Sequence, residues 1–172
     1  MFGKIFGSMK KDGATSQQTT NQWIKCPKCT ALMFYKEVEA KQNVCPKCNH
    51  HFRISAEKRI ESIVDKGSFV EHDASLAPTD PLKFSDKKSY KKRLEEEKAR
   101  TGKTSSVVSG SCTIGGLEAE IVVFDFSFMG GSLGSVEGEK IVRGVNRAMD
   151  KGCGFIIVSA SGGARMQEST YS

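Results

Sequence analysis

Residues 26–48, CPKCTALMFYKEVEAKQNVCPKC, decide the fold of the N-terminal part, because two Cys-Pro-Lys-Cys motifs stand 15 residues apart. The thiols of Cys26, Cys29, Cys45 and Cys48 have the spacing of a four-cysteine zinc site. Each motif forms a tight turn, and the residues between them, 30–44, can form a hairpin that brings the two turns together. Four thiolates then complete the tetrahedral shell of one structural Zn²⁺ per chain and leave no open position. The repeated motif predicts two equivalent turns.

Other uses of these cysteines fit the sequence less well. A thioredoxin-like redox centre needs one Cys-x-x-Cys motif beside a βαβ unit, and disulfides are rare in a chain without an export signal. His50 and His51 follow the second motif, but four cysteines already complete the metal shell, so both rings are predicted to face solvent. Cys112 and Cys153 are interpreted as buried apolar residues.

Composition is that of a globular protein, with 27% charged and 38% hydrophobic residues among 172. No stretch approaches the roughly 20 apolar residues that cross a membrane, and the N-terminus lacks the apolar core of a secretory signal. We therefore expect a cytoplasmic protein without a membrane span. Residues 1–100 carry a net charge of +7 and residues 101–172 a net charge of −1. A basic front half is open to two interpretations, a solvated surface or a contact with nucleic acid or an acidic partner.

Four segments follow from the changes in composition. Residues 1–21 are predicted to be a disordered tail, residues 22–54 a zinc ribbon, and residues 55–100 a helical linker region. Residues 101–172 lose charge and gain glycine, and are predicted to form an α/β domain. The ribbon is too small to fold on an apolar core alone, so the metal must supply much of its stability.

Two helices are predicted in the linker region. The first begins after Ser55 as N-cap, continues at helical spacing to Val64 and stops at Gly67. A loop over 76–84 separates it from a charged helix over 86–100. Oppositely charged residues four apart support that second helix: Lys91 and Glu95, Lys92 and Glu96, Arg93 and Glu97. A solvated helix face explains these charges better than a nucleic-acid contact.

The last segment has the pattern of a βαβ unit. Strands are predicted over 106–114 and 117–128, joined by a glycine hairpin, followed by a helix over 135–151 and a buried parallel strand over 155–158. Ser135 is predicted to cap the helix and Gly152 to end it. The apolar stripe of the helix is predicted to be Val142, Val145, Ala148 and Met149.

Two glycine clusters follow the strands and precede helices. Gly130 and Gly131 lie in the first cluster, and Gly162 and Gly163 lie in the second. Free backbone N–H groups and the positive end of a helix favour an anion at such positions, either a phosphate or an oxyanion formed during a reaction. Neither cluster spells a dinucleotide or P-loop motif, so an oxyanion is favoured over a phosphate. Glycines that merely serve tight turns remain the alternative.

Carboxylates near these clusters are interpreted as hydrogen-bonding residues. Asp125 and Glu168 lie near strand ends, where they could act as acid or base. All three histidines lie before residue 73, outside the α/β part, so no catalytic triad is predicted. The site is therefore expected to work mainly through backbone amides.

The runs FMGGSLGSVEGEK, residues 128–140, and SASGGARMQE, residues 159–168, closely resemble the β-subunit family of bacterial-type acetyl-CoA carboxylase carboxyltransferases. That family also carries an N-terminal four-cysteine zinc ribbon. The resemblance extends over residues 23–168, and the combination of ribbon and both motifs is specific. It implies an α/β fold: the zinc ribbon followed by the first part of a crotonase-like (ββα-spiral) domain.

The resemblance also implies a reaction. A carboxyl group would pass from carboxybiotin, on the biotin carboxyl carrier protein, to acetyl-CoA and give malonyl-CoA, the first step of fatty-acid synthesis. Biotin would also serve as the base. The N–H groups of Gly162 and Gly163 would stabilise one oxyanion, and Gly130 and Gly131 would shape the same substrate pocket.

Several partners are implied as well. A carboxyltransferase α subunit would complete the active site and form an α2β2 heterotetramer, while biotin carboxylase alone would use ATP. Because the chain stops at Ser172, at the start of an expected helix, we expect a truncated domain that is inactive alone. Two alternatives remain: a zinc-ribbon protein that binds nucleic acid, or another crotonase-type acyl-CoA enzyme, which would explain the glycines but not the ribbon.

Overall fold

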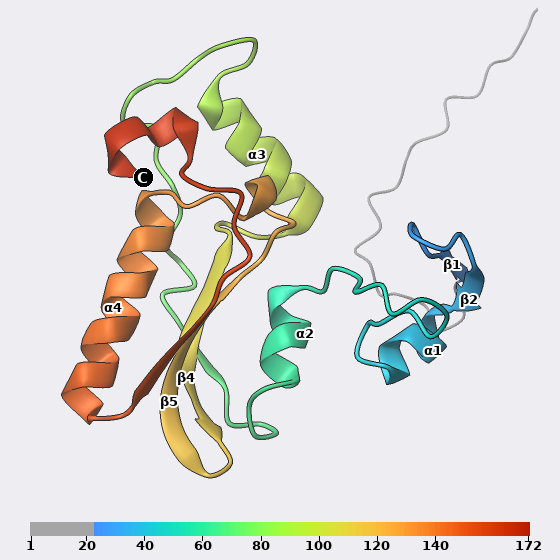
Figure 1. Cartoon of the computed structure of the whole chain (residues 1–172). Coiled ribbons are helices and arrows are strands. Elements are labelled where there is room, and N and C mark those ends of the chain that lie inside the picture. Colours follow the sequence, from blue (N-terminus) through green and yellow to red (C-terminus); the bar gives the residue numbers. More distant parts are fainter. Residues whose placement is uncertain (1–22) are drawn as a thin grey trace, which may run out of the picture. The chain divides into compact units, whose positions relative to one another are not determined.

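The computed structural model describes residues 23–172, so the tail predicted over residues 1–21 lies outside the described residues. The chain divides into two compact units, one ending at Arg53 and the other beginning at Ile54 (Figure 1). Within the described part, no helix is both long and apolar enough to cross a membrane.

The first unit is a small ribbon built around the first cysteine motif. Strand β1 (Trp23–Lys25) pairs antiparallel with β2 (Leu32–Phe34), and helix α1 (Tyr35–Ala40) follows directly. The hairpin predicted over 30–44 is therefore wrong. The strand partner of β2 lies before Cys26, and the YKEVEA segment forms a helix because its residues mostly favour helices and Val38 finds a buried place.

The core of this unit is small. Its fully buried apolar residues are Cys26, Met33, Val38 and Cys45, with partly buried neighbours such as Phe52. Two of the four core positions are thus cysteines of the repeated motif. A core of this size supports the expectation that the ribbon depends on a metal.

The second unit is built on a four-stranded sheet in the order β3-β4-β5-β6. Strand β3 (Val70–His72) pairs antiparallel with β4 (Val107–Ile114), and β4 pairs antiparallel with β5 (Leu117–Phe124). Helix α4 (Ser135–Lys151) then crosses over to β6 (Gly154–Val158), which lies parallel to β5. The predicted hairpin and βαβ unit are confirmed.

Helices cover both faces of this sheet (Figure 1). Ile121 and Val123 of β5 pack with helix α2 (Ala56–Glu61), whereas Val122 and Phe124 pack on the side of α4. This alternation is the two-residue period of a strand that is buried on both faces. The carboxyl ends of β5 and β6 lie at the same edge, and there the chain enters the glycine-rich segments.

The helices differ in detail from the predictions. Ser55 caps α2 as predicted, accepting a hydrogen bond from the Lys58 N–H at 3.3 Å, but the helix ends at Glu61. Gly67 lies in a later turn with a φ of 78°. The charged helix is α3 (Tyr90–Thr101), which begins four residues later than predicted.

The ion pairs around α3 are not the predicted ones. Lys88 pairs with Glu96, Arg93 with Asp86, and Arg100 with Glu97. Asp86 and Lys88, which precede the helix, thus pair with side chains within it. Arg100 also donates to the carbonyl oxygen of Ser127. Part of this charged face therefore holds the fold together and does not simply face solvent.

Helix α4 buries a different stripe from the predicted one. Ala148 is buried, but Val142 and Met149 are 54% and 73% exposed. The buried face instead includes the charged residues Glu137 and Lys140, each of which has hydrogen-bond partners in the interior. Gly134 occupies the N-cap position assigned to Ser135, and Gly152 ends the helix as predicted with a φ of 63°.

Strand β6 is less buried than predicted. None of its residues is fully buried, and Ile157 is 45% exposed. The reason is that, among the described residues, β6 is the edge strand of the four and has a neighbour only on the β5 side. Cys112, in β4, is buried as predicted, whereas Cys153 is only partly buried.

Candidate metal centre and glycine-turn site

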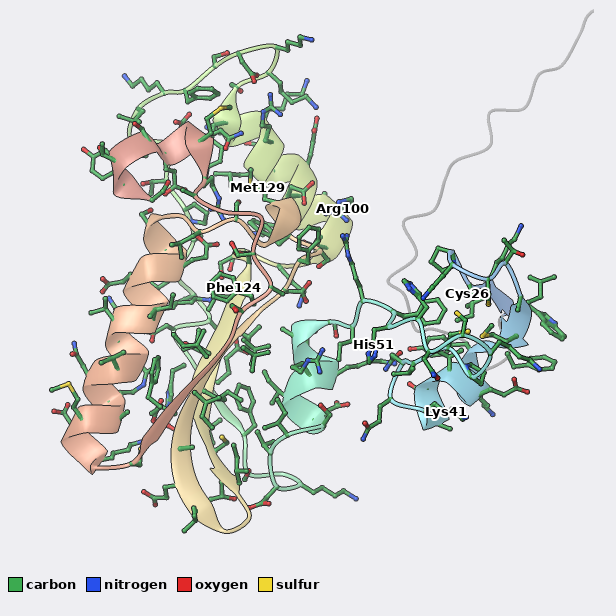
Figure 2. The ribbon with its side chains drawn as sticks, viewed as in Figure 1. Cys26, Lys41, His51, Arg100, Phe124 and Met129 are labelled. Carbon is green, nitrogen blue, oxygen red and sulfur yellow. The ribbon has the colours of Figure 1, made fainter. Side chains whose placement is uncertain are left out.

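The four predicted thiols meet in the ribbon, where their sulfur atoms gather near Cys26 (Figure 2). All four Sγ atoms lie within 4.8 Å of one another. The Sγ atoms of Cys26 and Cys48 are 3.6 Å apart, and those of Cys29 and Cys45 are 3.8 Å apart. Zn–S bonds of about 2.3 Å in a tetrahedron place the sulfurs about 3.8 Å apart. These side chains therefore fit a four-sulfur zinc ion.

The two cysteine turns have the same backbone geometry. In the first, the Cys26 N–H donates to the Ala31 carbonyl at 2.9 Å, and the Thr30 N–H donates to the Cys26 carbonyl at 2.9 Å. The second turn repeats both bonds at the corresponding positions, at 2.8 and 3.0 Å. Thr30 and its counterpart Asn49 both have left-handed backbones, with φ values of 59° and 57°.

Two thiols of this cluster differ in how readily they ionise. Burial and the neighbouring thiols raise the pKa of Cys48 to about 12, although the His50 N–H acts in the opposite direction. Burial also acts on Cys26, but N–H groups of Cys29 and Lys28 outweigh it and lower the pKa to about 7. A metal that binds four thiolates must therefore displace protons, as zinc does.

The histidines after the second motif lie outside this cluster. His51 is exposed, as predicted, and His50 is partly buried with its ring 5.3 Å from that of Phe52 in an edge-on arrangement. The metal group contains cysteines only.

In the second unit, the structure brings the four predicted glycines together. The first turn contains a short 3-10 helix, Met129–Gly131, and follows β5; the second follows β6. The Gly162 N–H donates to the Gly130 carbonyl at 2.9 Å. A Cβ on Gly131 would lie 2.1 Å from the carbonyl oxygen of Ala160, so only glycine allows this approach. We call residues 128–134 and 160–165 the two glycine turns.

The amides of these turns differ in their availability. The Gly162 N–H is used by the bond to Gly130, whereas the Gly163 N–H donates to the Ser161 hydroxyl within its own turn, at 3.1 Å. Both glycines are exposed. The Met129 N–H donates to the Glu97 carboxylate at 3.2 Å. The Gly163 N–H is therefore the amide from which an incoming oxyanion would most easily displace the present acceptor, the Ser161 hydroxyl.

The positive end of α4 is already occupied by the chain's own carboxylates. Glu137 accepts from the Gly134 N–H at 3.1 Å, and Glu168 accepts from the Ser135 N–H at 2.7 Å. Both carboxylates are buried. A phosphate at this helix end would have to displace them, so the first glycine turn is not a phosphate-binding loop.

Asp125 is a structural hydrogen-bond acceptor, as the sequence indicated. Its carboxylate accepts from the N–H groups of Ala56 at 3.0 Å and Ser127 at 2.8 Å, and Lys103 lies 3.0 Å away. Burial alone would raise the pKa of this carboxyl, but those bonds outweigh it and hold the pKa at about 2. A group so acidic and so fully bonded is unsuited to take a proton near neutral pH.

A buried arginine behind the glycine turns escaped the sequence-based prediction. The side chain of Arg165 is 0% exposed and pairs with Glu137 and Glu168. Hydrogen bonds from Tyr90 and Ser135 outweigh burial and lower the pKa of Glu168. The only local signal is an arginine three residues before a glutamate in SGGARMQE, since its other partners are distant in sequence. Figure 2 shows Arg100 and Met129 on the α3 side of the same region.

Two family models match the chain. The carboxyl transferase domain matches residues 49–172, and the acetyl-CoA carboxylase zinc finger domain matches residues 23–48. The acetyl-coenzyme A carboxylase carboxyl transferase subunit beta of Wolinella succinogenes is 61% identical over 171 residues, covering 99% of this chain and 59% of that protein. The same subunit of Citrifermentans bemidjiense is 52% identical over 150 residues, covering 87% and 53%. The chain thus spans a little over half of these relatives.

Solved structures with related sequences share the fold. Transcarboxylase 12S, with methylmalonyl-coenzyme A and methylmalonic acid bound, has a TM-score of 0.55 and 28% identity over 68% of this chain and 20% of that chain. A Pseudomonas malonate decarboxylase hetero-tetramer has a TM-score of 0.51 and 26% identity, covering 69% of this chain and 41% of that chain.

Proposed function

This chain belongs to the carboxyl transferase family, and we propose that it is part of a β subunit of acetyl-CoA carboxylase carboxyltransferase. Its fold is a four-cysteine zinc ribbon followed by the first part of a crotonase-like domain. The proposed reaction carries a carboxyl group from carboxybiotin to acetyl-CoA and gives malonyl-CoA. The observation that supports it best is the meeting of the two glycine turns at the carboxyl ends of β5 and β6.

The chain's own part in this reaction would be to stabilise negative charge. Carboxybiotin on the carrier protein would supply the carboxyl group and the base that takes a proton from the acetyl methyl group. The thioester oxygen then carries the charge of the enolate, and we assign the Gly163 N–H as its first donor. The Gly162 N–H would join only after releasing the Gly130 carbonyl. Loss of one such donor typically costs about 10²–10³ in rate.

Zinc would take no part in the chemistry. Cys26, Cys29, Cys45 and Cys48 fill all four positions of a tetrahedral shell, so no position remains for substrate or water. The metal would hold the ribbon together, and its removal would act on the fold of residues 23–53.

The proposed partners follow from the reaction. We assign a carboxyltransferase α subunit, in an α2β2 heterotetramer that completes the active site, together with the biotin carboxyl carrier protein and biotin carboxylase, which would use the ATP. Acetyl-CoA would be the acceptor, and the proposed location is the cytoplasm.

Glycine substitutions in the full-length subunit, assembled with its α subunit, test the role of the amides. We expect Gly163→Ala to lower turnover by about 10²-fold, because a φ of 108° strains any side chain and shifts the donor. Gly154→Ala is the matched control, since its Cβ would meet open space at the start of β6. Carboxylation of acetyl-CoA at the control rate by the Gly163 variant, with zinc content and circular dichroism unchanged, would refute the assignment.

A second candidate function, nucleic-acid binding by the ribbon, is favoured by one observation. The rings of Trp23 and Phe34 stack with centroids 3.8 Å apart, and the two residues are 60% and 40% exposed. Residues 23–53 carry six Lys or Arg against two Glu, and all six cationic residues are exposed. Exposed aromatic rings among cations suit single-stranded nucleic acid. Salt-dependent RNA binding that Trp23→Ala abolishes would support this function, and salt-independent binding would exclude it.

A further inference from the structure

Arg165 uses every hydrogen-bond donor of its buried guanidinium on groups around the glycine turns. An arginine has five N–H donors, and the acceptors are these: Nε to Ser132 Oγ at 3.0 Å, Nη2 to the Ser132 carbonyl and to Glu137, both at 2.8 Å, and Nη1 to Tyr90 Oη and to Glu168, both at 3.2 Å. Ser132 belongs to the first glycine turn, while Arg165 ends the second. One side chain therefore ties the two turns together from behind.

The backbone joins the turns at the same place. The Arg165 N–H donates to the Leu133 carbonyl at 2.7 Å, and the Leu133 N–H donates to the Gly163 carbonyl at 2.9 Å. The residue between these bonds, Ala164, forms a parallel bridge with Leu133. Gly163 lies two residues before Arg165, and its carbonyl is bonded to Leu133 of the first turn. The guanidinium of Arg165 binds the same turn through Ser132. Movement of the guanidinium must move both turns.

Charge explains why arginine occupies this position. The side chains of Glu137 and Glu168 are both 0% exposed, and a single guanidinium lies between them. The N-terminal amides of α4 take up the remaining negative charge, through Gly134 and Ser135. A lysine has three donors and no planar fork, so it would lose at least two of the five hydrogen bonds. Ser106 and Tyr90 would still donate to Glu137 and Glu168, but the direct links from residue 165 to both turns would be fewer and differently directed.

We propose that Arg165 is a positioning residue: it sets the spacing of the two glycine turns and thereby the direction of the Gly163 N–H. This inference rests on the proposed function, because it assigns a purpose to that direction. The side chain of Arg165 is buried, so we assign its effect to the turns that it binds. A displacement of about 1 Å in a catalytic group can cost about 10²-fold in rate, so Arg165→Lys is expected to lower kcat by about 10- to 100-fold. The KM for acetyl-CoA is expected to stay within about threefold.

The experiment compares Arg165→Lys with Arg147→Lys in the full-length subunit assembled with its α subunit. Arg147 is a matched control, because it also bridges two carboxylates, Glu120 at 3.1 Å and Asp73 at 2.8 Å, but touches neither glycine turn. Each variant is measured for kcat and KM, and for hydrogen–deuterium exchange in peptides covering 128–135 and 159–166. We expect slower turnover and faster exchange in these peptides for Arg165→Lys alone.

Each outcome decides the question. A kcat within twofold of the parent, unchanged exchange in both turns, or equal losses in the two arginine variants would overturn the proposal. If the parent does not carboxylate acetyl-CoA but the exchange pattern appears, the proposed function fails and the positioning role stands. Should Arg165→Lys not fold, Ser132→Ala removes only the acceptor of Nε. It is then expected to lower kcat about 3- to 10-fold, and an unchanged kcat would count against the role.

Discussion

Replacing Asp125 by asparagine should destabilise the second unit by an amount that the structure allows us to calculate. The carboxylate accepts from Ala56 and Ser127 and lies 3.0 Å from Lys103, while its side chain is 2% exposed. These contacts favour the ionised form and lower the pKa from 3.8 to about 2. At about 1.4 kcal/mol per pKa unit, the difference corresponds to about 2.5 kcal/mol of folding free energy at pH 7.

The pH dependence of this contribution has a definite sign. Because the pKa of Asp125 is lower in the folded state, the contribution is complete above about pH 5 and is lost as the pH falls from about 4 towards 2. At pH 3 about half of it remains. The asparagine variant has no carboxyl to titrate, so the gap between the two proteins should narrow on acidification.

Urea denaturation followed by far-ultraviolet circular dichroism, at pH 7 and at pH 3, measures both effects. Asp150→Asn serves as the control, because that carboxylate is exposed at the end of α4 and its loss is expected to change the midpoint little. A difference below about 0.5 kcal/mol at pH 7 would refute the magnitude. An equal difference at both pH values would refute the assignment of the low pKa to Asp125.

Three further predictions concern the ribbon and the glycine turns. Chelation of zinc should change the fluorescence of Trp23, the chain's single tryptophan, and leave the circular dichroism of the β-rich unit largely unchanged. Thr30→Asn should raise the free energy of unfolding of the ribbon, measured in urea by that fluorescence, by about 0.5–1 kcal/mol, because a β-branched residue is strained at a φ of 59°. An unchanged free energy would argue against strain. Gly131→Ala should lower the free energy of unfolding of the second unit, followed by circular dichroism, by about 2–4 kcal/mol, because its Cβ would overlap a carbonyl oxygen. Gly138→Ala is the control: its Cβ would lie in open space on α4, so this change should be neutral or stabilising.

Local patterns made the metal cluster and the βαβ unit predictable. In the metal cluster, Cys26 and Cys29 converge through one turn. In the hairpin between β4 and β5, the adjacent residues Gly115 and Gly116 both have positive φ, at 60° and 80°. Such features depend on residues a few positions apart. The helix over 135–151 was also predictable, because its amphipathic pattern and its terminal glycine agree.

Pairing between distant residues was not predictable in the same way. The partner of strand β2 was assigned to the wrong side of Cys26, because three-residue strands carry too little alternation to identify a partner. The buried stripe of α4 was misplaced because an apolar pattern does not identify buried charged residues such as Glu137 and Lys140. Their partners, Ser106 and Val107, lie about 30 residues away.

The Arg165 cluster shows the same limit at the candidate site. Its acceptors come from Tyr90, Ser132, Glu137 and Glu168, and the first of these lies 75 residues from the arginine. No spacing rule connects such a set. The glycines could be selected because backbone amides at strand ends suggest chemistry, whereas the side chain that holds the turns together became visible only in three dimensions.

The equivalence of the two cysteine turns has a consequence for the way in which the metal shell is built. Each turn is a closed unit of six residues with the same two hydrogen bonds and a left-handed residue at its fifth position. Each unit supplies two thiols, so the shell consists of two copies of one local geometry. The segment between them does not have to shape the shell, and it contributes helix α1 to the core of the ribbon through Val38 instead.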